Sequence, residues 1–400
     1  MTTFSSFPPL LAQAASSGDF VWVAYVLFIG LVIVFLALDL GVFHREAHEV
    51  KMKEAIFWSA IWLSLGVAFT GFVYLAYQNH WLGLGVSTRM FNPAVATDAT
   101  APLIIYGEVM GWTAAVQYLT GYVVEKSLAM DNIFVIAMIF GYFAVPAKYQ
   151  HRVLFWGIIG ALVMRGTMIG VGGELIMKYQ WILIIFGAFL LLTSLKMALV
   201  KSHSDPSSNP VVKLVKRLVE VTPFYDGQKF FTRRTLAPTY SKDLATGREV
   251  MDPPPTGTLR AKAAITPLFL ALIMVEITDL VFAVDSIPAV FAITPDPFIV
   301  FTSNIFAILG LRALYFCLAA LIQKFRFLTP ALIFILSFVG VKLLLLSLPP
   351  YLGVIGLDGL KSIKIDPSIS LTVVLGILFV ATVLSVLLPG KKEEDASAKP

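Results

Sequence analysis

The sequence contains little charge and almost no cysteine. Only 14% of its 400 residues are charged, 58% are hydrophobic, and the mean hydropathy is +0.83. Soluble domains carry about 25% charged residues, so this composition excludes an ordinary soluble protein and is typical of a multi-span membrane protein. The single cysteine, Cys317, excludes an internal disulfide framework and a thiolate metal cluster.

Histidine is also scarce. All five histidines fall in expected loops or at the ends of expected spans: His44, His48, His80, His151 and His203. A buried His/Cys site for zinc or copper is therefore not expected, and oxygen atoms remain as the ligands for any metal ion. No nucleophile–base pair and no cofactor motif stands out, so we expect neither an enzyme nor a bound cofactor.

The sequence is rich in long apolar stretches. We expect an all-α integral membrane protein with about nine transmembrane helices, because nine stretches are long enough to cross a hydrocarbon core of about 30 Å. They lie near residues 21–43, 55–77, 112–143, 153–171, 181–195, 263–293, 298–322, 330–348 and 369–388.

The basic residues predict the orientation of these spans. Of the 30 Lys and Arg residues, 22 lie in the C-terminal tail and the loops on one side of the membrane. Four lie in the opposite loops and four within spans: Arg89, Lys178, Lys361 and Lys364, then Lys126, Arg165, Arg312 and Lys342. Because cytoplasmic loops are enriched in Lys and Arg, we expect the N-terminus outside and the tail in the cytoplasm. The net charge of +5 is thus explained by basic cytoplasmic loops, and we expect no nucleic acid as a partner.

A short phrase, Ala-apolar-Asp, occurs three times inside apolar stretches and ends at Asp39, Asp131 and Asp285. In the last two copies an acid lies six residues earlier, Glu125 or Asp279, and a small polar residue follows the Asp: Asn132 or Ser286. Carboxylates are costly in a bilayer and commonly mark paths for ions or protons. These phrases predict an acidic cation site.

The two halves match beyond these phrases. Arg165 precedes Lys196 by 31 residues, and Arg312 precedes Lys342 by 30. The three spans in 111–196 therefore correspond to those in 263–348. Since three is an odd number, the second unit must enter the membrane in the opposite direction. Inverted repeats with a site at the midplane are a recurring plan of secondary transporters.

We expect broken helices near the midplane, because such breaks expose carbonyl groups as further ligands. Glu125-Lys126-Ser127 interrupts one long apolar stretch, and Pro288 removes a backbone donor just after Asp285. The alternative for Pro288 is a simple kink.

The deep acids are Glu125, Asp131, Glu276, Asp279 and Asp285, and only two deep arginines, Arg165 and Arg312, accompany them. A divalent cation, protons, or both must balance the remaining charge. For the arginines, charge compensation is favoured over substrate contact, and a purely structural network of acids and arginines is the alternative. Asp39 is a weaker candidate, since a solvated helix end explains it nearly as well.

The chain divides into seven regions on this basis. They are an extracytoplasmic N-terminus (1–20), two helices with an outer loop (21–110), the first three-helix repeat (111–196), a cytoplasmic loop (197–262), the second three-helix repeat (263–348), an outer loop with the last helix (349–390) and a cytoplasmic tail (391–400). The cytoplasmic loop is either a linker or a regulatory element, and Tyr225-Asp226-Gly227-Gln228 in it indicates a hairpin turn.

These residues resemble the TerC family of integral membrane proteins, named for tellurium resistance. The resemblance runs from about Ala37 to Leu346 and includes the phrases beginning at Gly121, Tyr225, Glu276 and Thr302. One departure is Gln117, where the family pattern leads us to expect an acid. The resemblance implies manganese homeostasis, chiefly export of Mn²⁺, in a superfamily of cation transporters with paired three-span repeats. It implies an ion site lined by Glu125, Asp131, Asn132, Glu276, Asp279, Asp285 and Ser286, with Asp39 as a contributor.

The expected function is thus a secondary transporter that exports Mn²⁺, with protons as the exchanged ion. Oxygen ligands suit Mn²⁺, Ca²⁺ and Mg²⁺ alike, so a Ca²⁺/H⁺ exchanger is the nearest alternative. The other alternative is a membrane scaffold linked to metal or tellurite stress, which docks partners through the cytoplasmic loop. The expected location is the bacterial cytoplasmic membrane. A thylakoid location is the lesser alternative, because residues 1–19 contain no arginine and so do not form a transit peptide.

Overall fold

The structure is a computed structural model of the full chain. It describes residues 20–41, 52–96, 101–179, 181–199, 217, 220–236, 240–242, 249–251, 259–319, 327–349, 363 and 365–387. The α-helices in these ranges are α2 (Val21–Gly41), α3 (Met52–Gln78), α4 (Gly111–Tyr142), α5 (Ala147–Lys178), α6 (Ile182–Leu199), α8 (Pro267–Phe291), α9 (Pro297–Ile308), α10 (Leu311–Ala319), α11 (Leu328–Ser347) and α13 (Pro367–Leu387).

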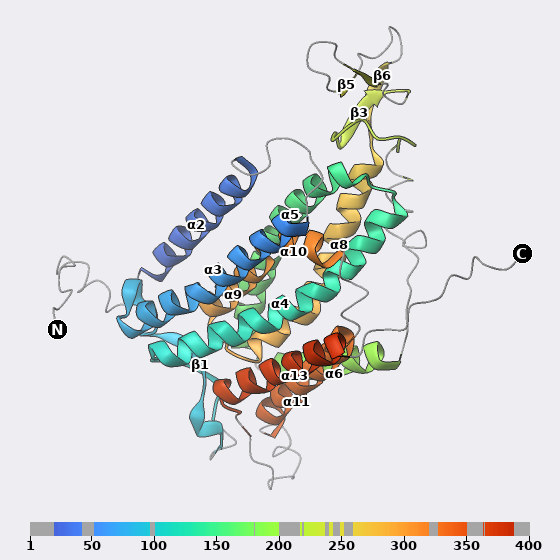
Figure 1. Cartoon of the computed structure of the whole chain (residues 1–400). Coiled ribbons are helices and arrows are strands. Elements are labelled where there is room, and N and C mark those ends of the chain that lie inside the picture. Colours follow the sequence, from blue (N-terminus) through green and yellow to red (C-terminus); the bar gives the residue numbers. More distant parts are fainter. Residues whose placement is uncertain are drawn as a thin grey trace, which may run out of the picture.

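The helices form a membrane-spanning bundle, which confirms the expected all-α membrane protein. Eight stretches are long and apolar enough to cross a bilayer, with α9 and α10 together making one of them. The 32 residues of α4 cover about 48 Å, and α4 lies among the other helices although it carries three charged residues (Figure 1). Large apolar side chains face outward on many helices, such as Val163, Leu192 and Phe379, each more than 60% exposed. Such a surface suits lipid rather than water.

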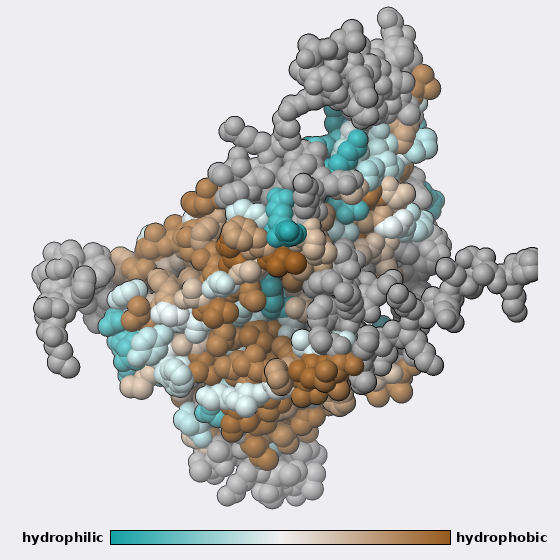
Figure 2. Space-filling view, viewed as in Figure 1, coloured by the Kyte–Doolittle hydropathy of each residue, from teal (hydrophilic) through white to brown (hydrophobic). Residues whose placement is uncertain are grey.

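Hydrophobic residues cover much of the central part of the face in Figure 2, and hydrophilic residues gather at its left and upper right, with a smaller group near the middle. Short strands lie at the ends of the bundle (Figure 1). One end carries the antiparallel pair β1 (Thr88–Phe91) and β2 (Ile104–Gly107), flanked by the 3₁₀ turns η2 (Trp81–Gly83) and η3 (Pro93–Ala96). The other end carries β3 (Phe231–Arg234) paired with β6 (Leu259–Ile265), and β4 (Tyr240–Lys242) paired with β5 (Glu249–Met251).

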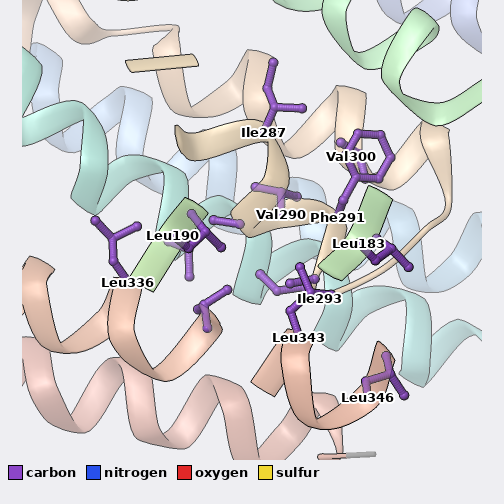
Figure 3. Close-up of a cluster of buried hydrophobic side chains, with 14 of the residues drawn as sticks. Leu183, Leu190, Ile287, Val290, Phe291, Ile293, Val300, Leu336, Leu343 and Leu346 are labelled. Carbon is purple, nitrogen blue, oxygen red and sulfur yellow. The ribbon is translucent and has the colours of Figure 1, made fainter. Parts of the chain in front are cut away.

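The core joins the two halves of the chain. Leu183 and Leu190 of α6 lie beside Val290 and Phe291 of α8 and Leu343 of α11 (Figure 3). The α6 and α11 backbones approach closely, because a Cβ atom on Gly187 would lie 3.2 Å from the carbonyl oxygen of Gly340. Small residues permit such close packing where lipid provides no hydrophobic driving force. The two helices occupy the third position of the two predicted repeats; the repeat itself stays a prediction.

The helix breaks lie elsewhere than expected. Helix α4 runs without interruption through Glu125-Lys126-Ser127, and α8 continues through Pro288 to Phe291. The predicted breaks at these positions are wrong. Pro288 lacks the N–H group that would donate to the carbonyl oxygen of Val284, and α8 continues past this missing hydrogen bond for three more residues. The break within the described spans lies instead between α9 and α10, where Gly310 adopts a φ of +76° and packs against Trp62. A side chain with a Cβ is strained at that φ, so glycine fits there.

Candidate functional site

Arg165 lies at the centre of the bundle and is 2% exposed. Its guanidinium group binds Asp279 through two parallel hydrogen bonds, from Nε to Oδ2 at 3.1 Å and from Nη2 to Oδ1 at 3.0 Å. Its Nη1 atom donates to the Glu125 carboxylate and to Asn304 Oδ1 at 3.2 Å, with Ser286 Oγ at 3.4 Å. A guanidinium fork matches a carboxylate in this way and holds both groups in one geometry.

The acids on either side of Arg165 come from different halves of the chain. Glu125 on α4 lies six residues before Asp131, and Asp279 on α8 lies six residues before Asp285. Both are buried, at 0% and 4% exposure, and both face Arg165. The residues that share a position in the two predicted repeats therefore meet at one cation. We call Glu125, Asn132, Arg165, Asp279, Ser286 and Asn304 the central cluster.

Two buried oxygen atoms of the central cluster lack a hydrogen-bond partner among the described residues. They are Glu125 Oε2 and Asn132 Oδ1. The amide group of Asn132 is otherwise held, because its Nδ2 donates to Asp279 Oδ1 at 3.0 Å. An unsatisfied buried acceptor costs about 1–3 kcal/mol, and a charged one costs more. These atoms are therefore available to a positively charged ligand.

The other predicted site residues lie apart from the central cluster or outside the described side chains. Asp285 is half-buried and faces α6, where the Thr193 hydroxyl donates to its Oδ1 at 3.0 Å. The Glu276 carboxylate lies against Gly160 of α5. Arg312 is buried at the start of α10. Asp39 and Asp131 belong to α2 and α4, but their side chains lie outside the described ones.

The described carboxylates do not gather into a single cage. No group of three His, Cys, Asp or Glu side chains close enough to hold a metal ion occurs among the residues that the structure describes. The cluster instead combines two carboxylates with amide and hydroxyl groups around one arginine. The hydrogen bond from Arg165 to Asn304 was not predicted from the spacing of the acids. The polar run Thr302-Ser303-Asn304 inside an apolar span is the sequence feature that could have indicated it.

Lys126 has a role that sequence reasoning missed. Its ammonium group donates to the backbone oxygens of Ala307 at 2.9 Å and Leu309 at 3.4 Å. Those carbonyl groups end α9 at the break before Gly310. A helix leaves its last carbonyls unsatisfied, and a cation there also complements the helix dipole. Lys126 thus caps the half-helix that carries Asn304.

A polar group of residues closes the end of the bundle that carries β1 and β2. Asp296 begins α9 and accepts hydrogen bonds from Tyr77 Oη at 2.6 Å and from the backbone N–H of Phe298 at 2.9 Å. Burial raises the pKa of Asp296, while the hydrogen bonds from Tyr77 and Thr88 oppose this rise. Arg89 of β1 binds Glu174 of α5 at 2.5 Å, which ties the hairpin to the bundle.

The opposite end is held by the segment Tyr225–Phe231, which we call the loop clamp. Tyr225 Oη donates to the carbonyl oxygen of Phe143 at the end of α4 at 2.5 Å. The Arg152 guanidinium of α5 lies 5.1 Å from the centre of the Phe230 ring, and Thr266 before α8 donates to the carbonyl oxygen of Lys229 at 2.8 Å. The expected turn is present, with Gly227 at a φ of 59°, but the hairpin is wrong: Val221 and Phe231 both pair with Ile265.

One described cavity lies away from the central cluster. It has a volume of about 690 Å³, lies between α2 and α3 and is lined mainly by apolar side chains such as Phe28, Phe69 and Phe72. With no carboxylate in its lining, it does not suit a cation.

Comparisons with known proteins place the chain in a family. The Integral membrane protein TerC family matches residues 110–393. An uncharacterized membrane protein of Myxococcus xanthus is 40% identical over 361 residues, covering 90% of this chain and 91% of that protein. A protein of Escherichia coli K12 named "Putative membrane-bound redox modulator Alx" is 41% identical over 321 residues, covering 79% of this chain and 84% of that protein.

A third relative, an uncharacterized membrane protein of Rickettsia bellii, is 35% identical over 334 residues, covering 82% of this chain and 91% of that protein. No solved structure matches the chain. Family and helical bundle agree on a multi-pass membrane protein with bacterial relatives. The chain belongs to the TerC family of integral membrane proteins.

Proposed function

We propose that the chain is a secondary transporter that exports Mn²⁺ from the cytoplasm in exchange for protons, through the central cluster. The observation that carries this proposal is the meeting of Glu125 and Asp279 at the bundle centre, with Glu125 Oε2 and Asn132 Oδ1 unpartnered among the described atoms. Carboxylate and amide oxygens are the ligands that Mn²⁺, Ca²⁺ and Mg²⁺ prefer. The choice of Mn²⁺ rests on the resemblance to the TerC family.

Proton exchange follows from the same groups. A carboxylate in a site that alternates between a metal ion and solvent holds either the ion or a proton, since desolvation favours its neutral form and a cation favours its charged form. The proposed direction rests on the basic loops, which assign the loop clamp end to the cytoplasm and the β1–β2 end to the outside. Asp285 and the predicted ligands Asp39, Asp131 and Glu276 then belong to the route toward or away from the central cluster.

The redox name of some relatives does not favour another mechanism for this chain. A thiol–disulfide exchange within one chain needs two cysteines, and this sequence contains only Cys317. The scaffold alternative is disfavoured because the loop clamp binds the ends of its own helices. A Ca²⁺/H⁺ exchanger remains the nearest alternative, since the same oxygen ligands suit Ca²⁺.

The test is Mn²⁺ flux into proteoliposomes containing the full chain, with and without a pH gradient. We expect saturable flux that depends on the gradient and that Asp131→Asn and Asp285→Asn each reduce to background. Excess Ca²⁺ as competitor separates the two exchangers. Deleting residues 201–216 leaves the loop clamp in place and should preserve flux. If no ion moves and the deletion abolishes protection of cells from manganese, the chain is a scaffold.

A further inference from the structure

The guanidinium group of Arg165 stands between two carboxylates from opposite halves of the bundle. It makes two hydrogen bonds to Asp279, of 3.0 and 3.1 Å, and one contact each with Glu125, Ser286 and Asn304. These are the oxygen atoms that a transported cation needs. A divalent ion and a guanidinium group repel each other and compete for the same ligands, so both cannot bind Glu125 and Asp279 at full strength.

A second position for the arginine lies nearby. Glu276 is three residues before Asp279 on α8, so the two lie on neighbouring parts of the same helix surface. Its carboxylate lies against Gly160, five residues before Arg165 on α5, and its Oε2 atom has no hydrogen-bond partner among the described residues. Side chains on a helix lean toward its N-terminus, which is the direction from Arg165 to Gly160.

We propose that Arg165 is a tethered competitor of the transported cation: its guanidinium occupies the cation position between Glu125 and Asp279, and it moves to Glu276 when the ion binds. This inference rests on the proposed function. The exchange keeps the central carboxylates compensated at each step, which matters because an uncompensated buried charge is costly. It also weakens ion binding, so that the ion is released on the far side instead of being held.

Glu276 acquires a distinct role under this inference. It was predicted as a metal ligand, whereas here it receives the displaced guanidinium and positions it away from the ion. Gly160 makes this possible, because a Cβ atom there would overlap the Glu276 carboxylate. Arg165 and Glu276 act as a pair, so their effects on binding should not be additive.

The experiment measures Mn²⁺ binding to the purified full chain in detergent, from the loss of the free Mn²⁺ signal in electron paramagnetic resonance. Arg165→Gln removes the competitor, and we expect it to lower the Kd for Mn²⁺ by about tenfold or more while slowing transport. Glu276→Gln should raise the Kd, because the arginine has lost its second position. The double variant should bind as tightly as Arg165→Gln. Arg312→Gln, which removes the corresponding arginine of the other half, is the matched control and should not tighten binding.

An unchanged or higher Kd in a folded Arg165→Gln protein overturns the inference and leaves Arg165 as a structural residue. Where Arg165→Gln does not fold, Glu276→Gln decides: an unchanged or lower Kd overturns the inference. The wild-type protein separates this question from the function. If it neither binds nor transports Mn²⁺ and Arg165→Gln alone gains binding, the competitor is real and the proposed function is wrong.

Discussion

The two carboxylates of α8 lie six residues apart and have different surroundings. Asp279 is buried and held by Arg165 and Asn132, whereas Asp285 is half-buried and held by the hydroxyl group of Thr193. Six residues turn a helix so that the two side chains point about 120° apart. Asp279 therefore faces α4 and α5, and Asp285 faces α6. Although both acids lie in apolar stretches of the same helix, Asp279 forms a fixed ion pair and Asp285 accepts a hydrogen bond from a neutral hydroxyl group.

This difference indicates that Asp279 contributes mainly to stability and Asp285 mainly to ion movement. Breaking a buried ion pair leaves a buried charge uncompensated, so Asp279 and its partners should be costly to change. Among the described residues, Asp285 accepts a hydrogen bond from Thr193 and forms no ion pair. A change at Asp285 should therefore affect ion movement more than stability.

The largest effect is expected for Asp279→Asn. It removes the charge that Arg165 binds with two hydrogen bonds, and we expect a loss of about 3–5 kcal/mol in stability. Thermal unfolding in detergent measures it. Asp285→Asn is the matched variant on the same helix and should cost less than about 1 kcal/mol. Equal losses in the two variants would show that the ion pair of Asp279 contributes no more to stability than the hydrogen bond of Asp285.

Lys126→Met should have the next largest effect. It leaves the carbonyl groups of Ala307 and Leu309 without their buried donor, at a cost of about 1–3 kcal/mol. Because α9 carries Asn304, this variant should also weaken Mn²⁺ binding at the central cluster. Lys178→Met, at the exposed end of α5, is the control and should leave both stability and binding near wild type. Identical melting of the two methionine variants would contradict the capping role.

A smaller effect is expected for Thr193→Val, which removes the donor to Asp285 and keeps the shape of the side chain. The loss in stability should be about 1 kcal/mol, since water replaces a donor at a half-buried carboxylate. Mn²⁺ flux should fall by more than the stability loss predicts, because Asp285 is proposed to lie on the ion route. Parallel flux and unfolding measurements test this. Normal flux through Thr193→Val would show that Thr193 does not support Asp285 on the ion route.

Tyr225→Phe should have the smallest effect and should leave the surroundings of Asp279 and Asp285 unchanged. It removes one hydrogen bond to the carbonyl oxygen of Phe143 and keeps the ring contacts of the loop clamp, at about 0.5 kcal/mol. Limited proteolysis should cut near the clamp faster, while Mn²⁺ binding stays unchanged. A clear loss of binding would show that the clamp acts on the central cluster.

Much of the fold could be predicted from the sequence, because apolar length and helix formation are local properties. Nine apolar stretches indicated the helices, and the paired acids indicated the central position of Glu125 and Asp279. The helix break could not be predicted from charge or proline. It depends on Gly310 meeting Trp62, and on Lys126 reaching across from α4, which are contacts between distant parts of the chain.

The same limit applies to the site. Spacing identified Arg165 as a compensating charge but not its place between the two acids. Asp279 and Asp285 lie six residues apart on one unbroken helix, and helix rotation separates them, but their spacing did not indicate which of the two meets Arg165. Asp296 was missed because it lies outside the spans, next to Pro297, and Tyr77 that binds it is far away in sequence.

An ion route through the central cluster is tested by Mn²⁺ flux in proteoliposomes that contain either Glu125→Gln or Glu108→Gln. Both variants neutralise one glutamate, but Glu125 is fully buried in the central cluster and Glu108 is exposed at the bundle end. We expect normal flux for Glu108→Gln and background flux for a folded Glu125→Gln protein. Equal flux through both variants would contradict an ion route through the central cluster.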